Sequence, residues 1–329
     1  MALIGIEEHW TTPALTAALE GLPVGRKDPS LAFNRIRDHL ERLQDLDVGR
    51  IAAMDEMSID VMVLGVAPPA TGPLDPADAL ALSRDTNDVA ADAIRRHPDR
   101  LRAMATLPMA DPDQVAGELE RAVGLGLVGA MVYGRTGATP LDDQRYDDLF
   151  AIATSLQQPI FIHPQIPSPA LLEASYAGFD DAVGLALSTF AWGWHLEAAL
   201  ATLRLIARGT FDRHPDLQIV LGHWGELLLF WQDRFGSLTG IAGLERPVAD
   251  VVRQNLHITS SGMFNPALLH HALEATTIDR LLFSTDYPFQ HPSRADIEQF
   301  LKELPSDDDR EQFASGNASR LYGIEVAST

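Results

Sequence analysis

Five polar residues follow short apolar runs in this sequence, and their types are those that bind metal ions or move protons. Glu7 and His9 come directly after the run ALIGI, whereas His163, His223 and Asp286 each follow a later run. Residues two apart on a strand share a face, so Glu7 and His9 are expected to point the same way. A carboxylate and an imidazole at a buried strand end are costly to desolvate unless a cation lies between them. The alternative is an exposed strand end with solvated polar groups.

Four of these residues form a mixed nitrogen and oxygen ligand set: Glu7, His9, His163 and Asp286. Such a set suits Zn²⁺ or Mn²⁺ and contains too many nitrogens for Ca²⁺. The sequence has no cysteine, so disulfides and thiolate–zinc sites are excluded. We therefore predict one divalent ion, zinc or manganese, held by histidine and carboxylate side chains.

A second pair of residues is suited to acid–base chemistry. His223 is followed three residues later by Glu226. A carboxylate at this distance can hydrogen-bond the imidazole, fix its tautomer and raise its basicity. We predict that His223 and Glu226 are a catalytic pair rather than further metal ligands. Glu226 also suits the first turn of a helix, where the helix dipole favours an acid, and the two roles are compatible.

The elements that must position these side chains are short strands separated by helices. Eight apolar runs are predicted as strands, at residues 2–6, 61–64, 101–107, 128–132, 159–162, 218–221, 256–258 and 281–283. Alternation of strands and helices implies parallel pairing with right-handed crossovers, and eight such strands close into a (β/α)8 barrel, an α/β fold. The carboxyl ends of barrel strands share one face, so all the polar residues above are expected in one bowl.

Helices are predicted between these strands, at residues 36–57, 75–97, 111–124, 142–157, 181–208, 225–238, 246–254 and 266–275. Residues 11–35 are predicted as an irregular loop after the first strand. The alternative is a doubly wound sheet in two domains. However, the chain contains no Pro/Ser-rich linker and no G-x-G-x-x-G turn after a strand. We therefore predict a single barrel domain over residues 1–329.

The composition narrows the classes of partner. The formal net charge is −21 over 329 residues, which disfavours nucleic acid and anionic membrane surfaces as partners. An anionic small substrate would need a local positive centre in such a chain. No apolar segment reaches the ~20 residues that span a bilayer, and a signal-peptide pattern is absent. We expect a soluble cytoplasmic protein.

Several stretches resemble the metal-dependent decarboxylase branch of the amidohydrolase superfamily. That branch includes γ-resorcylate (2,6-dihydroxybenzoate), 2,3-dihydroxybenzoate and aminocarboxymuconate semialdehyde decarboxylases. The similar stretches span nearly the whole chain in order: IEEHW at 6–10, MDEMSIDVMVLGV at 54–66, RAMATLPMADPD at 102–113, FIHPQ at 161–165, LRLIARGTFDRHPDLQIVLGHWGE at 203–226, LHITSSGMF at 256–264, LLFSTDYPF at 281–289 and GNASRLYGI at 316–324. The E-x-H opening is more similar to the hydroxybenzoate enzymes than to the semialdehyde enzyme.

The resemblance implies non-oxidative decarboxylation of a hydroxylated aromatic or related unsaturated carboxylic acid by a homodimer or homotetramer. Asp286 or His223 could deliver the proton, and the resemblance favours Asp286, with His223 and Glu226 holding the substrate hydroxyl. By the same likeness, Arg234 and Phe289 line the substrate pocket. A surface position for Arg234, paired with an acidic residue, is the alternative.

The sequence departs from the hydroxybenzoate enzymes in two loops. Residues 133–136 read Tyr-Gly-Arg-Thr where those enzymes tend to have Asn-Gly-Phe, and residues 11–35 are not similar to theirs. Arg135 is expected to be a solvated loop cation rather than an anion contact. The eight remaining histidines are expected to be structural or at the surface: His39, His97, His195, His214, His257, His270, His271 and His291.

Two other functions stay open at this point. A hydrolase or hydratase on the same barrel would use His223 to activate a metal-bound water that attacks a lactone, amide or alkene. A binding barrel without catalysis would have a degenerate metal site, which the five intact polar residues argue against.

Overall fold

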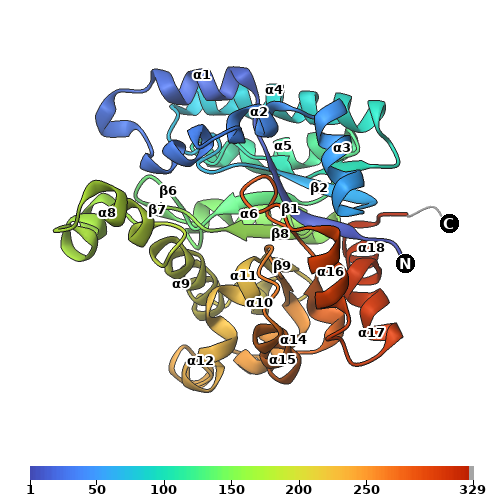
Figure 1. Cartoon of the computed structure of the whole chain (residues 1–329). Coiled ribbons are helices and arrows are strands. Elements are labelled where there is room, and N and C mark those ends of the chain that lie inside the picture. Colours follow the sequence, from blue (N-terminus) through green and yellow to red (C-terminus); the bar gives the residue numbers. More distant parts are fainter. Residues whose placement is uncertain (326–329) are drawn as a thin grey trace.

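Parallel strands occupy the centre of the protein, as the computed structural model of residues 1–325 shows (Figure 1). They are β1 (Ile4–Trp10), β2 (Val61–Val66), β3 (Leu101–Ala103), β4 (Ala105–Thr106), β5 (Ala130–Tyr133), β8 (Ile160–His163), β9 (Ile219–Leu221), β10 (Leu256–Thr259) and β11 (Leu281–Leu282). They form two sheets, with the orders β1-β2-β3 and β11-β10-β9-β8-β5-β4.

The two sheets join into one closed barrel. Only Met104 separates β3 from β4, so these two strands occupy one position, and the Met104 N–H donates to the Leu64 carbonyl over 2.8 Å. On the other side, the Ile6 N–H donates to the carbonyl of Phe283, just after β11, over 3.0 Å. The described residues therefore form the predicted eight-position (β/α)8 barrel, with each strand within a few residues of its predicted place.

Helices cover the outside of the barrel, with those of the N-terminal half on one side in Figure 1 and those of the C-terminal half on the other. The α-helices are α1 (Pro13–Gly21), α2 (His39–Gln44), α3 (Val48–Met57), α4 (Pro76–Arg96), α5 (Pro112–Gly124), α6 (Asp147–Ser155), α7 (Pro169–Leu171), α8 (Asp181–Ser188), α9 (Gly193–Ala207), α10 (Thr210–Arg213), α11 (His223–Glu226), α12 (Leu228–Phe235), α13 (Leu238–Ile241), α14 (Val248–Asn255), α15 (Pro266–Ala275), α16 (Arg294–Leu301), α17 (Asp307–Glu311) and α18 (Asn317–Tyr322). A hairpin of β6 (Arg135–Thr136) and β7 (Thr139–Pro140) follows β5. No helix among residues 1–325 is long and apolar enough to cross a membrane.

The core has an inner and an outer part. The larger cluster lies between strands and helices and contains side chains such as Trp10, Met54 and Leu64. A smaller separate cluster draws Ile4, Ile6 and residues of other strands together with Tyr322 from α18. Because this cluster takes a member from strands around the whole barrel, it is the barrel interior.

The segment after β1 differs from the predicted irregular loop because it begins with helix α1. The Thr12 hydroxyl caps this helix by accepting from the Leu15 N–H over 3.0 Å, and Pro13 follows at the first helical position. A threonine followed by proline is a helix-start signal in the sequence. The prediction of a wholly irregular segment over residues 11–35 was therefore wrong.

Two predicted helices are broken. The predicted helix over residues 36–57 is divided into α2 and α3, and the buried Arg50 guanidinium donates to the carbonyls of Arg42 and Asp45 at 3.0 and 3.1 Å. The predicted helix over residues 181–208 is divided at residues 189–192, between α8 and α9. At that break a Cβ on Gly193 would lie 2.5 Å from the Ser188 carbonyl oxygen, so only glycine fits there.

Candidate metal centre

Three of the predicted ligands lie together at the carboxyl end of the barrel. One ligand atom from each of Glu7, His9 and His163 lies within 4.8 Å of the others, and all three side chains are buried. Glu7 and His9 are on β1, and His163 ends β8. The fold therefore brings these three predicted ligands together at one site.

A bulge in β1 directs Glu7 into this site. The pairing of β1 with β2 shifts between Ile6 and Glu8, so that Glu7 is the extra residue, and it has a φ of 85°. Ile6 before the bulge lies in the inner cluster. The extra residue reverses the alternation beyond it and lets Glu7 and His9 face the barrel interior as well.

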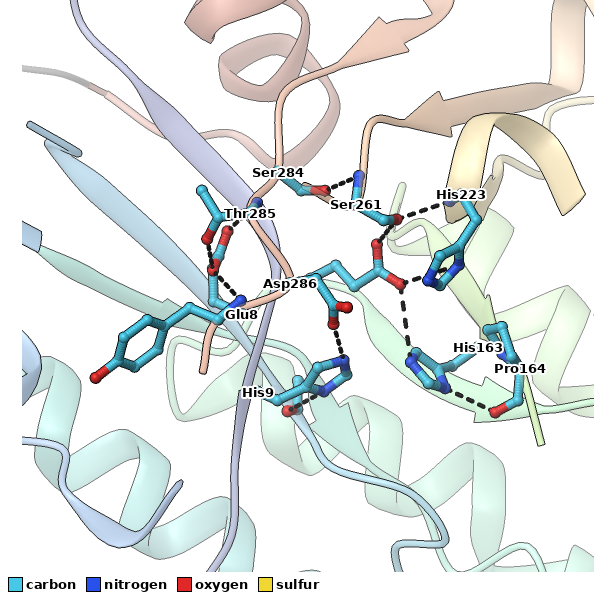
Figure 2. A network of polar contacts seen from close by, with 12 residues as sticks. Glu8, His9, His163, Pro164, His223, Ser261, Ser284, Thr285 and Asp286 are labelled. Atoms are coloured by element: carbon cyan, nitrogen blue, oxygen red, sulfur yellow. Dashed lines mark hydrogen bonds and ion pairs between the residues drawn. The ribbon is translucent and has the colours of Figure 1, made fainter. Parts of the chain in front are cut away.

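Asp286 approaches the same site from the loop after β11. Its Oδ1 lies 3.3 Å from Nε2 of His9, and the two side chains point toward each other in Figure 2. The residues on both sides of Asp286 are held by Glu8, whose carboxylate accepts from the Thr285 N–H at 2.9 Å and the Tyr287 N–H at 3.1 Å. Asp286 itself has a φ of 62°, a strained value of the kind found at functional positions.

The atoms that face the centre are left without hydrogen-bond partners. Oε1 of Glu7 and Nε2 of His9 are buried and have no such partner among the described residues. Oε2 of Glu7, in contrast, accepts from the hydroxyls of Thr259 and Ser261. Nδ1 of His163 lies 2.7 Å from the Pro164 carbonyl, and a donor at Nδ1 leaves the Nε2 lone pair free to bind a metal.

The electrostatics of these residues also fit a bound cation. Burial raises the pKa of Glu7 to about 7, with His223 and His9 opposing the effect. Burial, together with the neighbouring His9 and His223, holds the pKa of His163 well below its ordinary value, so this ring is neutral. Nε2 of His163 lies 3.7 Å from Oε1 of Glu7, too far for a hydrogen bond. Buried carboxylate oxygens and imidazole nitrogens that face one point and lack hydrogen-bond partners are typical of a divalent metal site.

His223 and Glu226 lie beside this centre, on the turn that follows β9. Their contact is direct, with Nδ1 of His223 2.8 Å from Oε1 of Glu226. Burial lowers the pKa of His223, but Glu226 and Glu7 outweigh it and raise the value to about 10. Burial raises the pKa of Glu226, whereas His223 and His195 outweigh it and lower the value to about 2. His223 and Glu226 therefore form a buried imidazolium–carboxylate pair beside the predicted metal ligands.

The short element α11 is a left-handed turn rather than a right-handed helix. His223, Trp224 and Glu226 have φ values of 47°, 56° and 53°. The interpretation of Glu226 as a residue in the first turn of a right-handed helix was therefore wrong, and α12 begins only at Leu228. A Cβ on Gly222 would lie 2.6 Å from Oε1 of Glu7, so a larger residue here would displace the Glu7 carboxylate.

Sequence reasoning missed His195 at this site. Its Nδ1 lies 2.7 Å from Oε2 of Glu226, so the carboxylate is shared between two histidines. His195 is on α9, and no apolar run or spacing in the sequence connects it with Glu226. The prediction that His195 is merely structural or at the surface needs correction, because the residue touches the predicted catalytic pair.

A cavity of about 230 Å³ opens over the predicted metal ligands, with His9, His163 and Asp286 in its lining. Aromatic side chains form much of its wall, and Phe289 is among them as predicted. Its lining residues are His9, Ser30, Phe33, Asn34, Ile36, His39, Pro68, His163, Phe190, Trp194, His223, Asp286, Phe289 and Gln290. His39, expected to be structural or at the surface, also belongs to this wall and packs edge-on against Phe289.

Two arginines of interest do not line this cavity. Arg234 is exposed on α12 and lies outside the cavity wall formed by the described residues. Arg135 lies beside a larger cavity of about 850 Å³, and its guanidinium donates to the Ile166 and Gly137 carbonyls at 2.6 and 3.1 Å. The expectation that Arg135 is a solvated loop cation was wrong, because its guanidinium is hydrogen-bonded to the hairpin after β5 and to the segment after β8.

Comparisons with known proteins agree on one family. A profile described as amidohydrolase matches residues 22–324. γ-Resorcylate decarboxylase of Rhizobium radiobacter is 33% identical over 336 residues, which cover 98% of each chain.

Two solved structures resemble the fold closely. One is a dihydroxybenzoic acid decarboxylase of Polaromonas sp. JS666 with manganese and the inhibitor 2-nitroresorcinol, with a TM-score of 0.84, 32% identity and coverage of 98% of this chain and 97% of that one. The other is 5-carboxyvanillate decarboxylase of Novosphingobium aromaticivorans with manganese and 4-hydroxy-3-methoxy-5-nitrobenzoic acid. Its TM-score is 0.89 at 27% identity, with coverage of 98% of this chain and 96% of that one.

Proposed function

Since this chain belongs to the amidohydrolase family, we propose that it is a metal-dependent, non-oxidative decarboxylase of hydroxylated aromatic acids. The observation that carries the proposal is the set of unpartnered, buried metal-binding atoms at the floor of an aromatic cavity, with an acid–base pair beside it. The relatives named above act on or bind dihydroxybenzoates, a nitroresorcinol and hydroxymethoxybenzoates, which share one hydroxylated ring.

The proposed metal ligands are the four predicted from strand ends: Glu7, His9, His163 and Asp286. Their mixed nitrogen and oxygen atoms suit manganese or zinc, and the manganese in both solved relatives supports the first. A divalent ion bound there would supply positive charge for the substrate carboxylate and the adjacent hydroxyl. Positive charge is needed because the chain carries a net charge of −21.

The proton that replaces the carboxylate comes, in this proposal, from Asp286. Decarboxylation breaks the bond between the ring carbon and the carboxylate carbon, CO₂ leaves, and a proton must be added to that ring carbon. Asp286 lines the cavity next to His9, so its carboxyl group can deliver the proton to a ring held above the ligands. The carboxyl group is then reprotonated from solvent before the next cycle.

His223 and Glu226 position the substrate in this proposal. His223 lines the cavity, and its Nδ1 contacts Glu226, so that its Nε2 is left to bind a substrate hydroxyl. Glu226 is buried, and its hydrogen bond to Nδ1 holds the His223 imidazole in one orientation.

The wall of the cavity supports a small aromatic substrate. Phe33, Phe190, Trp194 and Phe289 surround a space of about 230 Å³, below the volume of drug-sized ligand pockets. Aromatic rings favour offset or edge-on contacts with a substrate ring. Arg234 is left out of the proposed substrate site because it is exposed on α12 and does not line this cavity.

We also propose that the protein is a homodimer or homotetramer. Large apolar side chains on α9 and α12, among them Leu200, Phe230 and Trp231, are 54–69% exposed in the single chain. Both helices contact the turn α11 and lie on the same side of the barrel in Figure 1. Exposed apolar groups of this size are typical of protein interfaces. Light scattering coupled to size exclusion tests this, and a monomer at micromolar concentration would contradict it.

The activity is tested by measuring CO₂ and phenol release from 2,6-dihydroxybenzoate, 2,3-dihydroxybenzoate and 5-carboxyvanillate by the protein loaded with manganese or zinc. Equal amounts of both products from at least one acid are expected. 3,5-Dihydroxybenzoate is the matched control, because without an adjacent hydroxyl it cannot chelate and should not react. Hydrolysis of a lactone or amide without CO₂ release would instead favour a hydrolase.

A further inference from the structure

His195 joins the proposed catalytic pair to the aromatic wall of the cavity. Its Nδ1 lies 2.7 Å from Oε2 of Glu226, and its Nε2 lies 3.1 Å from the indole nitrogen of Trp194. The carbonyl oxygen of Phe190 is 2.9 Å from the same Nε2. The His195 imidazole therefore lies against the carboxylate that holds His223 and against two residues that line the cavity, Phe190 and Trp194.

The hydrogen-bond directions fix the role of each ring nitrogen. An indole N–H can only donate and a carbonyl oxygen can only accept, so Nε2 of His195 cannot bond Trp194 and Phe190 at the same time. In the neutral ring Nε2 accepts from the Trp194 indole, and the Phe190 carbonyl lies beside it without a hydrogen bond. Nδ1 then carries the proton and donates to Glu226, as a buried carboxylate requires. His223 donates to the other oxygen at 2.8 Å, so both oxygens of Glu226 are saturated by imidazole.

These contacts argue against a second metal among His195, His223 and Glu226, although the three side chains are grouped closely enough to hold one. Both histidines contact the carboxylate directly at hydrogen-bond distance, and no unpartnered atom is left between them. Around Glu7 the separations are longer and the inward atoms are unpartnered. The group with His195 is therefore a hydrogen-bonded positioning unit.

Other contacts also support the wall near His195, among them the backbone hydrogen bond from the Trp192 N–H to the Thr189 carbonyl at 3.0 Å and the packing of Trp194 against Phe33. This wall lies at the break between α8 and α9, where Thr189 and Trp192 have non-helical backbone angles. The Phe190 side chain is 55% exposed, and its ring packs edge-on against Phe33 at 5.4 Å between centroids. The hydrogen bond that His195 accepts from the Trp194 indole adds a further constraint on this wall.

We propose that His195 is a positioning residue with two separable effects on the reaction. Through Nδ1 it fixes Glu226 and hence the ring of His223 that binds the substrate hydroxyl. Through Nε2 it accepts from the Trp194 indole and so holds that side of the cavity wall against the substrate ring. The inference rests on the proposed decarboxylase function and names a further residue for it.

Two conservative variants separate the effects. In His195→Asn the side-chain amide takes the place of Nδ1 and keeps the bond to Glu226, but nothing replaces Nε2. We expect KM to rise about tenfold and kcat to stay within threefold of the parent. In His195→Gln the amide reaches the place of Nε2 and the bond to Glu226 is lost. We expect kcat to fall about tenfold or more with little change in KM, the range seen when outer-shell partners are removed.

Matched measurements separate this inference from the proposed function. His214→Asn is the control, since His214 contacts Asp147 far from the cavity residues. All variants should keep the parent's manganese content and melting temperature. The low-field proton resonances of the His–Glu hydrogen bonds provide a readout without turnover. Both variants should lose the resonance of His195, whereas the resonance of His223 should stay in place in His195→Asn and shift in His195→Gln.

Each result decides one question. If the parent protein turns over no hydroxybenzoate but the resonances change as expected, the proposed function fails and the positioning contact stands. If His195→Asn and His195→Gln show the same kcat and KM, or both match the parent within twofold, the two-sided role of His195 is overturned.

Discussion

Replacing Glu8 by glutamine tests how the protein holds Asp286 at the metal centre. The Glu8 side chain is fully buried and accepts from the Thr285 N–H at 2.9 Å, the Tyr287 N–H at 3.1 Å and the Thr285 hydroxyl. Burial raises the pKa of Glu8, whereas these hydrogen bonds lower it. Its two oxygens therefore clamp the backbone on both sides of Asp286.

The expected cost follows from the number of acceptors. Glutamine has one amide oxygen, so Glu8→Gln keeps one N–H bond and turns an NH₂ group toward the other donor. A hydrogen bond to a charged group contributes ~1.5–3 kcal/mol, and burying a neutral amide instead of a carboxylate offsets part of the loss. We expect a net decrease of about 2 kcal/mol in the free energy of unfolding. If half of this free energy, about 1 kcal/mol, is lost from the positioning of Asp286 as a ligand, the manganese dissociation constant rises about fivefold.

Urea unfolding of the metal-free protein measures the first quantity, and isothermal titration with manganese measures the second. Glu274→Gln on the exposed surface of α15 is the matched control and should change neither. If Glu8→Gln unfolds at the parent's urea concentration and binds manganese equally well, the reasoning that Glu8 positions Asp286 is refuted.

Three other changes have defined outcomes. His163→Ala should lose stoichiometric metal by elemental analysis, because too few ligands remain; retention of the metal would contradict its role as a ligand. His223→Ala should keep the metal but lower turnover of a hydroxybenzoate by ~10²–10⁴-fold, and a change of only a few-fold would remove it from the mechanism. Burial and, to a smaller extent, Arg280 lower the pKa of His257 from 6.5 to about 3 in the native state. As the pH falls below 6.5, His257 is therefore protonated in the unfolded chain while it stays neutral in the native protein, and this favours unfolding. The native state should lose on the order of 5 kcal/mol from this group between these pH values. His257→Gln should remove that part of the acid loss in urea titrations, and equal pH slopes for both proteins would disprove it.

The strands and most ligand positions were predictable because their signals are local. Short apolar runs mark buried strands, and polar residues directly after them mark strand ends. The stretches that end in His163, His223 and Asp286 follow this pattern, and the barrel brings those residues to the same face. Helix breaks were harder, since the division at Asp45 involves Arg50, whose guanidinium also donates to the His9 carbonyl 41 residues away.

The sequence by itself determined the order of strands and helices and the residue types at the strand ends, because both are carried by neighbouring residues. Only the tertiary structure decided which way those residues face. Ile4 and Ile6 fill the barrel interior, so strict alternation would turn Glu7 and His9 outward, and the bulge at Glu7 reverses that direction. Likewise, His195 reaches Glu226 only through the packing of α9 against the turn after β9. A bulge and a contact between distant elements depend on long-range packing, which short-range patterns in a sequence do not encode.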